Sequence, residues 1–487
     1  MQLFEYQYVT LFLPCRHGML HCNIMIIKQL YLDGFSHHLC GSAPRSCSKS
    51  LENAAGQLGG LSRLAGRFFA PKLLAPSAKS RNRHFPTMVV FWAFLSQVLT
   101  RNASCRAALS SVQAWAAARK KAIPSNNTGA YCQARARLSL ETLRGVFNAV
   151  GSWIERRCEG QMPLLAGRVV RVIDGTGITM PDSPQNRKKW PYASNQKPGC
   201  GFPAIKLVGM FCLRTGRMVK FAFDCLDQSE FVLARQLVGW VKKGEVVLAD
   251  RGFCSWGLIA LFQRKGVDVV MRLHHLRKDK AGTSIWPKRW RSGSWSRTLW
   301  GELPEKLVMR IIAFEVHVKG FRTRRIKLCT TLLNAKDYPD EALIELYMRR
   351  WKIELYLRDI KVTLGLDVLR CLSPEMVEKE IWMQAIAHNL VRALMLEAAM
   401  THGVALERLS FKGTVDMMRT WAGWMHHDKP GINRELMSKM LLAIAADQVP
   451  WRPLRSEPRV QKRRPKDYPY LTKPRHKLDP ADSRRKR

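Results

Sequence analysis

The stretch from residue 168 to residue 273 constrains the fold most, because short apolar strands alternate there with helices. Amphipathic segments at residues 229–241 and 255–264 predict helices. Five runs rich in Val, Ile and Leu predict strands at residues 169–173, 204–213, 217–225, 245–249 and 267–272. The order of three strands, helix, strand, helix and strand predicts an α/β domain built on one sheet.

The segments on either side of this domain differ in pattern. A helical unit precedes it, whose polar stripe of Gln133, Arg135 and Arg137 either faces DNA or is an ordinary solvated helix face. A Trp-rich segment with a strong hairpin predicts a β-rich insertion. We expect a poorly defined leader at residues 1–84 and a helical unit at residues 85–160. The α/β core would then occupy residues 165–273 and 338–400, on either side of the β-strand insertion at residues 274–337. C-terminal helices at residues 401–450 and a basic tail at residues 451–487 would follow.

The charge of the chain narrows the class of partner. Lys and Arg number 80 and Asp and Glu number 38, so the formal net charge is +42. A polyanion would offset this self-repulsion, which favours nucleic acid first and an anionic membrane surface second.

Apolar runs stay shorter than the roughly 20 residues that cross a bilayer. The scattered Cys residues lack a C-x-x-C motif and argue against a disulfide framework or structural zinc, so we expect a cytoplasmic protein.

Two of the predicted strands end on an aspartate. Asp174 follows the strand at 169–173, and Asp250 follows the strand at 245–249. Adjacent strand ends can hold two carboxylates a few Å apart, where divalent cations would offset their repulsion. Hard oxygen ligands select Mg²⁺ or Mn²⁺, and two such ions about 4 Å apart suit phosphoryl transfer. One strand-end Asp usually marks only a turn, whereas two in this order of elements favour a metal site.

A predicted long helix at residues 340–364 supplies a third carboxylate. Tyr347, Arg350, Glu354 and Lys361 are spaced by 3, 4 and 7 residues. At about 100° per residue this spacing places all four on one face. The stripe suits a metal-bound phosphodiester, with Glu354 on the metal, the two cations on phosphate oxygens and the tyrosine on a phosphate or base. A surface ion-pair helix has similar spacing, so the stripe alone leaves both interpretations open.

Together, the stripe and the two aspartates resemble a known family. Tyr347-x2-Arg350-x3-Glu354-x6-Lys361 matches the Y-(2)-R-(3)-E-(6)-K signature of the insertion-sequence-4 family of DDE transposases. The sequences VIDGTG and LADRGF, which contain the two aspartates, resemble the contexts of the family's catalytic aspartates. The Trp-rich segment is similar to the family's β-strand insertion. The resemblance covers about residues 85–399.

This resemblance implies an RNase H-like mixed sheet with flanking helices. It implies a catalytic and metal-binding triad of Asp174, Asp250 and Glu354, and DNA-phosphate contacts at Tyr347, Arg350 and Lys361. Family members cut both strands at each transposon end and join the free 3′ hydroxyl to target DNA. Some pass through a hairpin, with an insertion Trp holding a flipped base.

We therefore expect a Mg²⁺-dependent transposase, with Mn²⁺ as a substitute, that uses two ions and acts on the bacterial nucleoid. It would bind transposon-end and target DNA as a homodimer that forms on the DNA. The apolar side of residues 434–446 is a candidate dimer contact, and packing of this helix against the catalytic domain is the alternative. For the function, two alternatives stay open: an RNase H-like nuclease that does not join DNA, and a non-catalytic DNA-binding remnant acting as a repressor.

Overall fold

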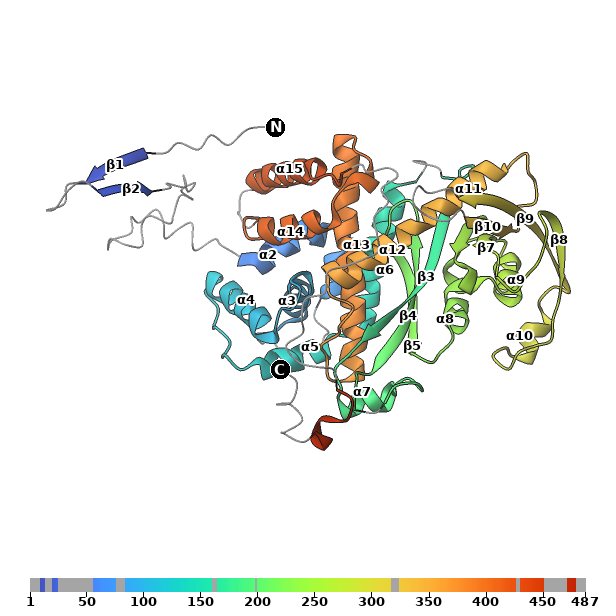
Figure 1. The fold of residues 1–487 in the computed structure, drawn as a ribbon. Coiled ribbons are helices and arrows are strands. Elements are labelled where there is room, and N and C mark those ends of the chain that lie inside the picture. The colour runs from blue at the N-terminus through green and yellow to red at the C-terminus, as the bar shows by residue number, and fades with distance from the viewer. Residues whose placement is uncertain are drawn as a thin grey trace. The chain divides into compact units, whose positions relative to one another are not determined.

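The computed structural model describes residues 9–13, 20–24, 56–75, 84–159, 164–197, 199–316, 324–425, 430–450 and 471–478. The chain divides into two compact units, residues 1–52 and 53–487. The first contains an antiparallel pair of strands, β1 (Val9–Leu13) and β2 (Leu20–Ile24) (Figure 1). Among the described residues, no helix combines the length and apolar character that a membrane crossing requires. The predicted basic tail lies outside the described residues except for residues 471–478.

Eight strands form one mixed sheet in the second unit, in the order β5-β4-β3-β6-β7-β10-β9-β8 (Figure 1). Strand β4 is antiparallel to both of its neighbours, β5 and β3, whereas β6 and β7 run parallel to β3. All five predicted strands are present. The strands are β3 (Val170–Thr179), β4 (Ala204–Cys212), β5 (Met218–Cys225), β6 (Val246–Ala249), β7 (Asp268–Arg272), β8 (Gly282–Pro287), β9 (Lys306–Val316) and β10 (Arg324–Thr330).

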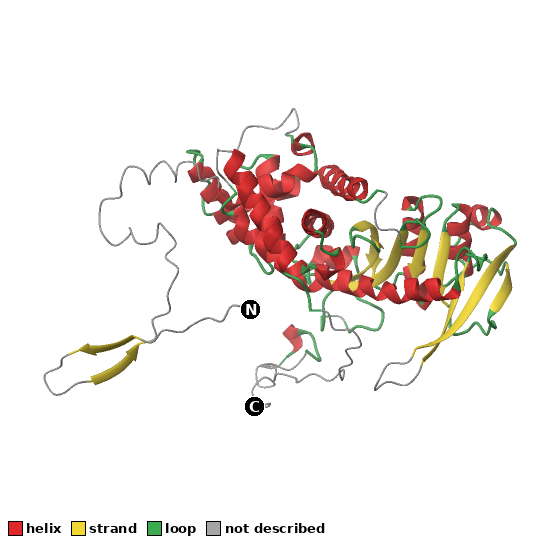
Figure 2. Ribbon diagram, turned by 90° about the horizontal axis from the view of Figure 1, so that it is seen from above, coloured by secondary structure: helices red, strands yellow, loops and turns green. Residues whose placement is uncertain are grey.

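Successive residues of the central strands face two separate apolar cores. In β6, Val246 and Leu248 belong to one core, and Val247 and Ala249 belong to the other. Helices α6, α12 and α13 cover the first face, and α8 and α9 cover the second, so the central strands are apolar on both sides (Figures 1 and 2). These helices are α6 (Leu140–Arg157), α8 (Glu230–Leu237), α9 (Trp256–Arg264), α12 (Lys352–Arg358) and α13 (Pro374–His402).

The Trp-rich segment extends this same sheet. Strand β10 pairs with β7, and β9 and β8 follow outward, all antiparallel. The turn predicted at residues 319–320 lies outside the described residues. Further helices of the second unit are α3 (Thr87–Leu99), α4 (Cys105–Ala118), α5 (Thr128–Arg137), α7 (Pro184–Lys189), α10 (Arg297–Gly301), α14 (Phe411–Ala422) and α15 (Pro430–Ala446).

Part of the segment predicted to be a poorly defined leader is folded. Helix α2 (Gly56–Ala65) contacts α3, α4 and α14, and its Leu58, Leu61 and Leu64 are buried. Gly60 permits the close approach to α14, because a Cβ there would lie 1.6 Å from the carbonyl oxygen of Ala422. The prediction is wrong for this segment because its glycines dilute an apolar spacing that only tertiary packing makes useful.

The prediction that residues 434–446 form a dimer contact is also wrong. This segment belongs to α15, which packs against α13 and α14. Its Met440, Leu441 and Ile444 are buried within the chain. The apolar side of the helix therefore serves intramolecular packing.

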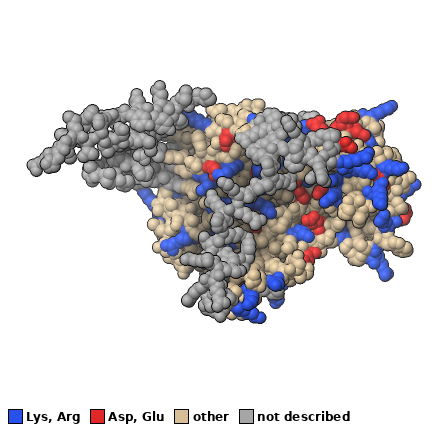
Figure 3. Space-filling model, viewed as in Figure 1, with Lys and Arg blue, Asp and Glu red and all other residues tan. Residues whose placement is uncertain are grey.

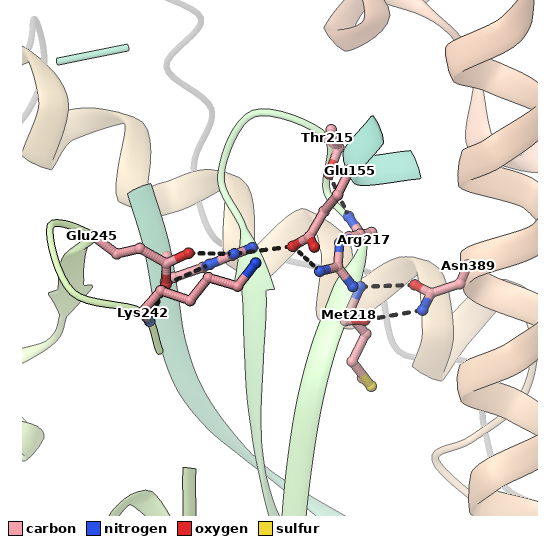
Figure 4. A network of polar contacts seen from close by, with 8 residues as sticks. Glu155, Thr215, Arg217, Met218, Lys242, Glu245 and Asn389 are labelled. Atoms are coloured by element: carbon pink, nitrogen blue, oxygen red, sulfur yellow. Dashed lines mark hydrogen bonds and ion pairs between the residues drawn. The ribbon is translucent and has the colours of Figure 1, made fainter. Parts of the chain in front are cut away.

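A buried ion-pair network joins α6 to the sheet (Figure 4). Arg171, near the start of β3, is 3% exposed. Its Nη2 lies 2.5 Å from Glu245 Oε1 and 3.0 Å from Glu155 Oε1, and Arg217 pairs with the same Glu155 oxygen. On α13, the Asn389 amide bonds the backbone N–H and C=O of the first residue of β5, at 2.8 and 2.9 Å. We call the part of the sheet that holds this network, at the starts of β3, β5 and β6, the closed end.

Candidate active site

Asp174 and Asp250 are neighbours in register. Strands β3 and β6 are parallel, and Ile173 lies opposite Ala249. Asp250 follows the last residue of β6, whereas β3 continues to Thr179, so Asp174 lies in the middle of its strand. The prediction that the first strand ends at Asp174 is therefore wrong, because the chain goes on pairing with β4 beyond that residue. Both aspartates nevertheless come directly after the paired residues Ile173 and Ala249, so their backbones lie side by side. Each carboxylate accepts a hydrogen bond from the backbone N–H of the following residue, at 2.9 and 2.7 Å. These bonds orient the two side chains.

The segment that carries the third carboxylate is not one regular α-helix. Helix α11 (Asp340–Met348) leads into a 3₁₀ turn (Arg349–Trp351), then α12, and then a π turn (Asp359–Thr363). Irregular turns change the angle per residue, so the predicted single face does not hold. Tyr347 and Arg350 are buried, whereas the Glu354 side chain is 50% exposed.

Arg350 lies between the first aspartate and the glutamate. It is 6% exposed; its Nη1 is 3.8 Å from Asp174 Oδ2 and its Nη2 is 3.7 Å from Glu354 Oε1. Both contacts are longer than the 2.7–2.9 Å or so of a tight charged hydrogen bond. Lys361, in the π turn, has no ion-pair partner within 4 Å among the described residues. The structure thus brings Arg350 to the carboxylates and leaves Lys361 apart from them.

The environment changes the ionisation of this group. Burial raises the pKa of Asp174 to about 6, and the charges of Asp250 and Glu230 add to that rise. The Gly175 N–H and the Arg350 guanidinium oppose it. Burial likewise raises the pKa of the Tyr347 hydroxyl to about 12. The site therefore holds crowded negative charge that one arginine only partly offsets.

Glu230 is a residue of this site that the sequence analysis missed. It lies in the first turn of α8, and its Oε1 is 2.6 Å from the position that a Cβ on Gly175 would take. The missing side chain at Gly175 therefore makes room for a carboxylate beside Asp174. Acidic residues are common in the first turn of helices, so the sequence contained no signal that set Glu230 apart.

The donor chemistry of the site fits a divalent cation. Asp174, Asp250 and Glu354 offer hard carboxylate oxygens, which such ions prefer. Within the described ranges, no three Asp, Glu, His or Cys side chains converge closely enough to form a metal-binding group. Arg350, in contact with Asp174 and Glu354, supplies positive charge between them.

Comparisons with known proteins agree with this geometry. Residues 165–390 match the family model of the transposase DDE domain. The chain is 26% identical over 409 residues to the transposase InsG of insertion sequence element IS4 from Escherichia coli strain K12, covering 81% of this chain and 89% of that protein.

Among solved structures, the cryo-EM structure of a piggyBac transposase synaptic complex with hairpin DNA aligns with a TM-score of 0.39 and 10% identity, over 82% of this chain and 87% of that one. A likeness this weak adds nothing to the assignment. The DDE-domain match spans Asp174, Asp250 and Glu354, and the IS4 relative is similar over most of its length. Residues 165–390 of this chain are therefore identified as a DDE transposase domain.

Proposed function

We propose that this transposase cleaves DNA at the ends of an insertion sequence and joins the freed 3′ hydroxyl to target DNA. The observation that carries the proposal is the register of β3 and β6, in which Asp174 lies beside Asp250, with Arg350 in contact with both Asp174 and Glu354. The strand order, three antiparallel strands followed by two parallel ones, supports an RNase H-like core in residues 165–273 and 338–400.

We assign two divalent ions, Mg²⁺ or Mn²⁺ in its place, to Asp174, Asp250 and Glu354. Bound there, they would stabilise charge on phosphate oxygens and activate the attacking oxygen. The paired strand β3 holds Asp174 in a fixed position, and the end of β6 does the same for Asp250. Because the pKa of Asp174 is about 6, its carboxylate is largely ionised at neutral pH and available as a ligand. Arg350 offsets the repulsion among the carboxylates.

The DNA contacts divide by burial. Tyr347 and Arg350 lie in the protein interior beside the triad, so we propose that they reach only the phosphate that is cleaved. Lys361 is half-buried and forms no ion pair in the described part of the chain, so its ammonium group is available to a flanking phosphate.

Residues 85–160 are our candidate for the unit that binds the transposon end. We propose that two chains assemble as a homodimer on two ends, because concerted joining needs both ends in one complex and two-fold symmetry is the commonest closed arrangement. A chain of charge +42 repels its own copy, and DNA would offset that repulsion. Light scattering with and without end DNA tests this: a 1:1 complex that performs concerted joining contradicts it. We place this activity on the bacterial nucleoid, in the cytoplasm.

Trp290 is our candidate for the tryptophan that holds a flipped base, if the pathway passes through a hairpin. Trp286 and Trp295 are buried and Trp300 packs beside them, whereas Trp290 is 98% exposed between Arg289 and Arg291. Lys and Arg side chains gather over the β8–β10 part of the sheet (Figure 3). We expect Trp290→Ala to leave the melting temperature unchanged and to reduce hairpin formation, with partial rescue by Trp290→Phe. Normal hairpin yield from Trp290→Ala would exclude this residue.

A direct test uses the full chain and duplexes that carry the inverted repeats flanking its coding region. With Mg²⁺ we expect cleavage at the repeat ends and covalent joining to a second duplex. Cleavage without joining would favour the nuclease alternative. Specific binding without cleavage in either Mg²⁺ or Mn²⁺ would favour the non-catalytic DNA-binding protein.

A further inference from the structure

Arg135 is a buried cation far in sequence from the catalytic carboxylates. It lies on α5 and is 9% exposed, whereas Gln133 and Arg137 on the same helix face solvent. Its guanidinium carbon lies 4.9 Å from the ring centre of Phe94 and 5.7 Å from that of Tyr131. The predicted solvated stripe therefore does not include Arg135, whose charge points into the protein.

The hydrogen-bond partners of Arg135 are neutral. Its Nη1 donates to Gln97 Oε1 at 3.0 Å, its Nη2 approaches Cys371 Sγ at 3.7 Å, and its Nε has no partner in the described part of the chain. No carboxylate of the described residues lies within 4 Å of it. Burying a charged group without an ionic partner costs free energy of folding, so a bound anion beside Arg135 would stabilise this arrangement.

A cavity of about 190 Å³ lies beside this guanidinium. The start of α4 lines it, at Ser104 and Cys105. The Ser104 side chain caps only the Ala107 N–H, and the positive end of the helix dipole adds to the charge of Arg135. The one acidic residue that lines the cavity is Glu380. Its carboxylate accepts hydrogen bonds from the backbone N–H groups of residues 370 and 371.

We propose that this cavity is a second anion site, which binds a phosphate group through Arg135 and the N-terminus of α4. The cavity also touches Leu364 and Gly365, directly after the π turn that follows the Glu354 helix, so it joins the helical unit to the catalytic core. The phosphate has two possible sources, free phosphate or a DNA backbone phosphate. Neither depends on the proposed chemistry, because binding is measured without metal or cleavage.

Thermal unfolding of the full chain tests the site. Sodium phosphate is titrated against sodium chloride at equal ionic strength, in the presence of a chelator. We expect a saturable rise of several degrees in melting temperature for the wild type and for the matched control Arg137→Gln, an exposed arginine on the same helix. Arg135→Gln should lose that rise. An equal phosphate-dependent rise in all three proteins would overturn the proposal, since it would report only the general basic surface.

A second variant covers the case in which Arg135→Gln does not fold. Cys105→Asp places a carboxylate in the cavity at the first position of α4, where Gln97 Nε2 already approaches the Cys105 sulfur at 3.7 Å. We expect Cys105→Asp to raise the melting temperature in phosphate-free buffer and to abolish most of the phosphate-dependent rise. The neutral control Cys105→Asn should do neither. If Cys105→Asp keeps the full phosphate-dependent rise, the cavity is not the anion site.

Duplex DNA separates the two sources of phosphate. If a backbone phosphate occupies the site, Arg135→Gln should reduce the slope of the logarithm of the DNA-binding constant against the logarithm of the salt concentration by about 0.9, because about one counterion fewer is released on binding. Arg101→Gln, which removes an exposed arginine, serves as the comparison. If free phosphate is the ligand, that slope stays unchanged while the phosphate-dependent rise in melting temperature is lost. If Arg135→Gln keeps both the wild-type salt slope and the phosphate-dependent rise in melting temperature, the proposed anion site is wrong.

Discussion

Arg171 and Arg350 are both buried and both lie between two carboxylates, on either side of the short strand β6. Arg171 meets Glu245, the residue before β6, whereas Arg350 meets Asp174, which lies beside the residue after β6. At the closed end, Arg171 Nη2 lies 2.5 and 3.0 Å from Glu245 and Glu155. At the carboxyl end, the nitrogens of Arg350 lie 3.7 and 3.8 Å from Glu354 and Asp174. The same pairing is therefore tight at one end and loose at the other.

We interpret the short contacts of Arg171 as ion pairs that stabilise the fold, and the long contacts of Arg350 as part of the catalytic site. Glu245 is buried, so its charge needs Arg171. Asp174 and Glu354 retain 24% and 50% side-chain exposure, and their oxygens have contact lengths that leave capacity for another ligand. We call this carboxyl end the open end. The predictions below test whether stability depends on the closed end and chemistry on the open end.

Loss of a carboxylate at the open end should have the largest effect. We expect Asp174→Ala, Asp250→Ala or Glu354→Ala to slow cleavage by at least about 10³-fold, because the metal ions and the phosphate lose a ligand. DNA affinity, which comes mainly from cations, should change little. Gel assays of cleavage and binding measure both. The matched control is Glu345→Gln, an acid on α11 whose ion-pair partner is the exposed Arg349. Glu354→Ala with a near wild-type rate would contradict the triad.

The two arginines should differ in what their loss costs. Arg171→Met leaves Glu245 buried without its partner, so we expect a loss of about 3–5 kcal/mol in the free energy of unfolding. Arg350→Met should lose only about 1–2 kcal/mol, because its contacts are long and its partners partly solvated. Urea denaturation measures both. Cleavage by Arg350→Met should nevertheless fall well below that of the wild type at temperatures where both are folded. Equal stability losses would remove the distinction between the two ends.

The crowded charge at the open end should make stability depend on pH. The pKa of Asp174 rises from 3.8 to about 6 in the folded chain, so the folded state binds more protons between those values. Its contribution to stability therefore falls as pH rises from about 4 to 6, by about 2–3 kcal/mol.

Asp174→Asn removes this titration. We expect the variant to be more stable than the wild type at pH 7, with the advantage disappearing near pH 4, in denaturation curves recorded with a chelator. An advantage that does not change with pH would show that the pKa of Asp174 is not raised.

A methyl group added at each end should give the smallest effect. A Cβ at Gly175 would lie 2.6 Å from Glu230 Oε1, the mobile end of a half-buried side chain at the open end. A Cβ at Gly151 would lie 2.6 Å from Arg217 Nη1, part of the closed network. We expect Gly175→Ala to change stability by less than about 1 kcal/mol. Gly151→Ala should destabilise the protein despite a helix-propensity gain of about 1 kcal/mol. The opposite order would mean that the closed end is the more adaptable one.

The sequence by itself determined the order of strands and helices along the chain, the two aspartates after apolar runs and the resemblance to a family, but it ended the first strand too early, because β3 continues past Asp174 to Thr179. Apolar runs and the residues that follow them are local features, and a motif such as Tyr347, Arg350, Glu354 and Lys361 is recognised by spacing alone. These features depend on neighbouring positions of the chain, so they can be predicted before any contact is known. The resemblance needed only these residues and their immediate contexts.

The tertiary structure alone decided which charges are buried and which partners they meet. The spacing of Arg350 predicted a polar face, but the 3₁₀ turn directs its side chain inward, beside Asp174. Glu230 had no distinctive local pattern, and Arg135 was placed in a polar stripe that the structure does not keep, because the surroundings of both come from segments distant in sequence. A regular period assumes a constant angle per residue and says nothing about which distant surface approaches. The ionisation and pairing of the site depend on that approach, which is why they had to come from the fold.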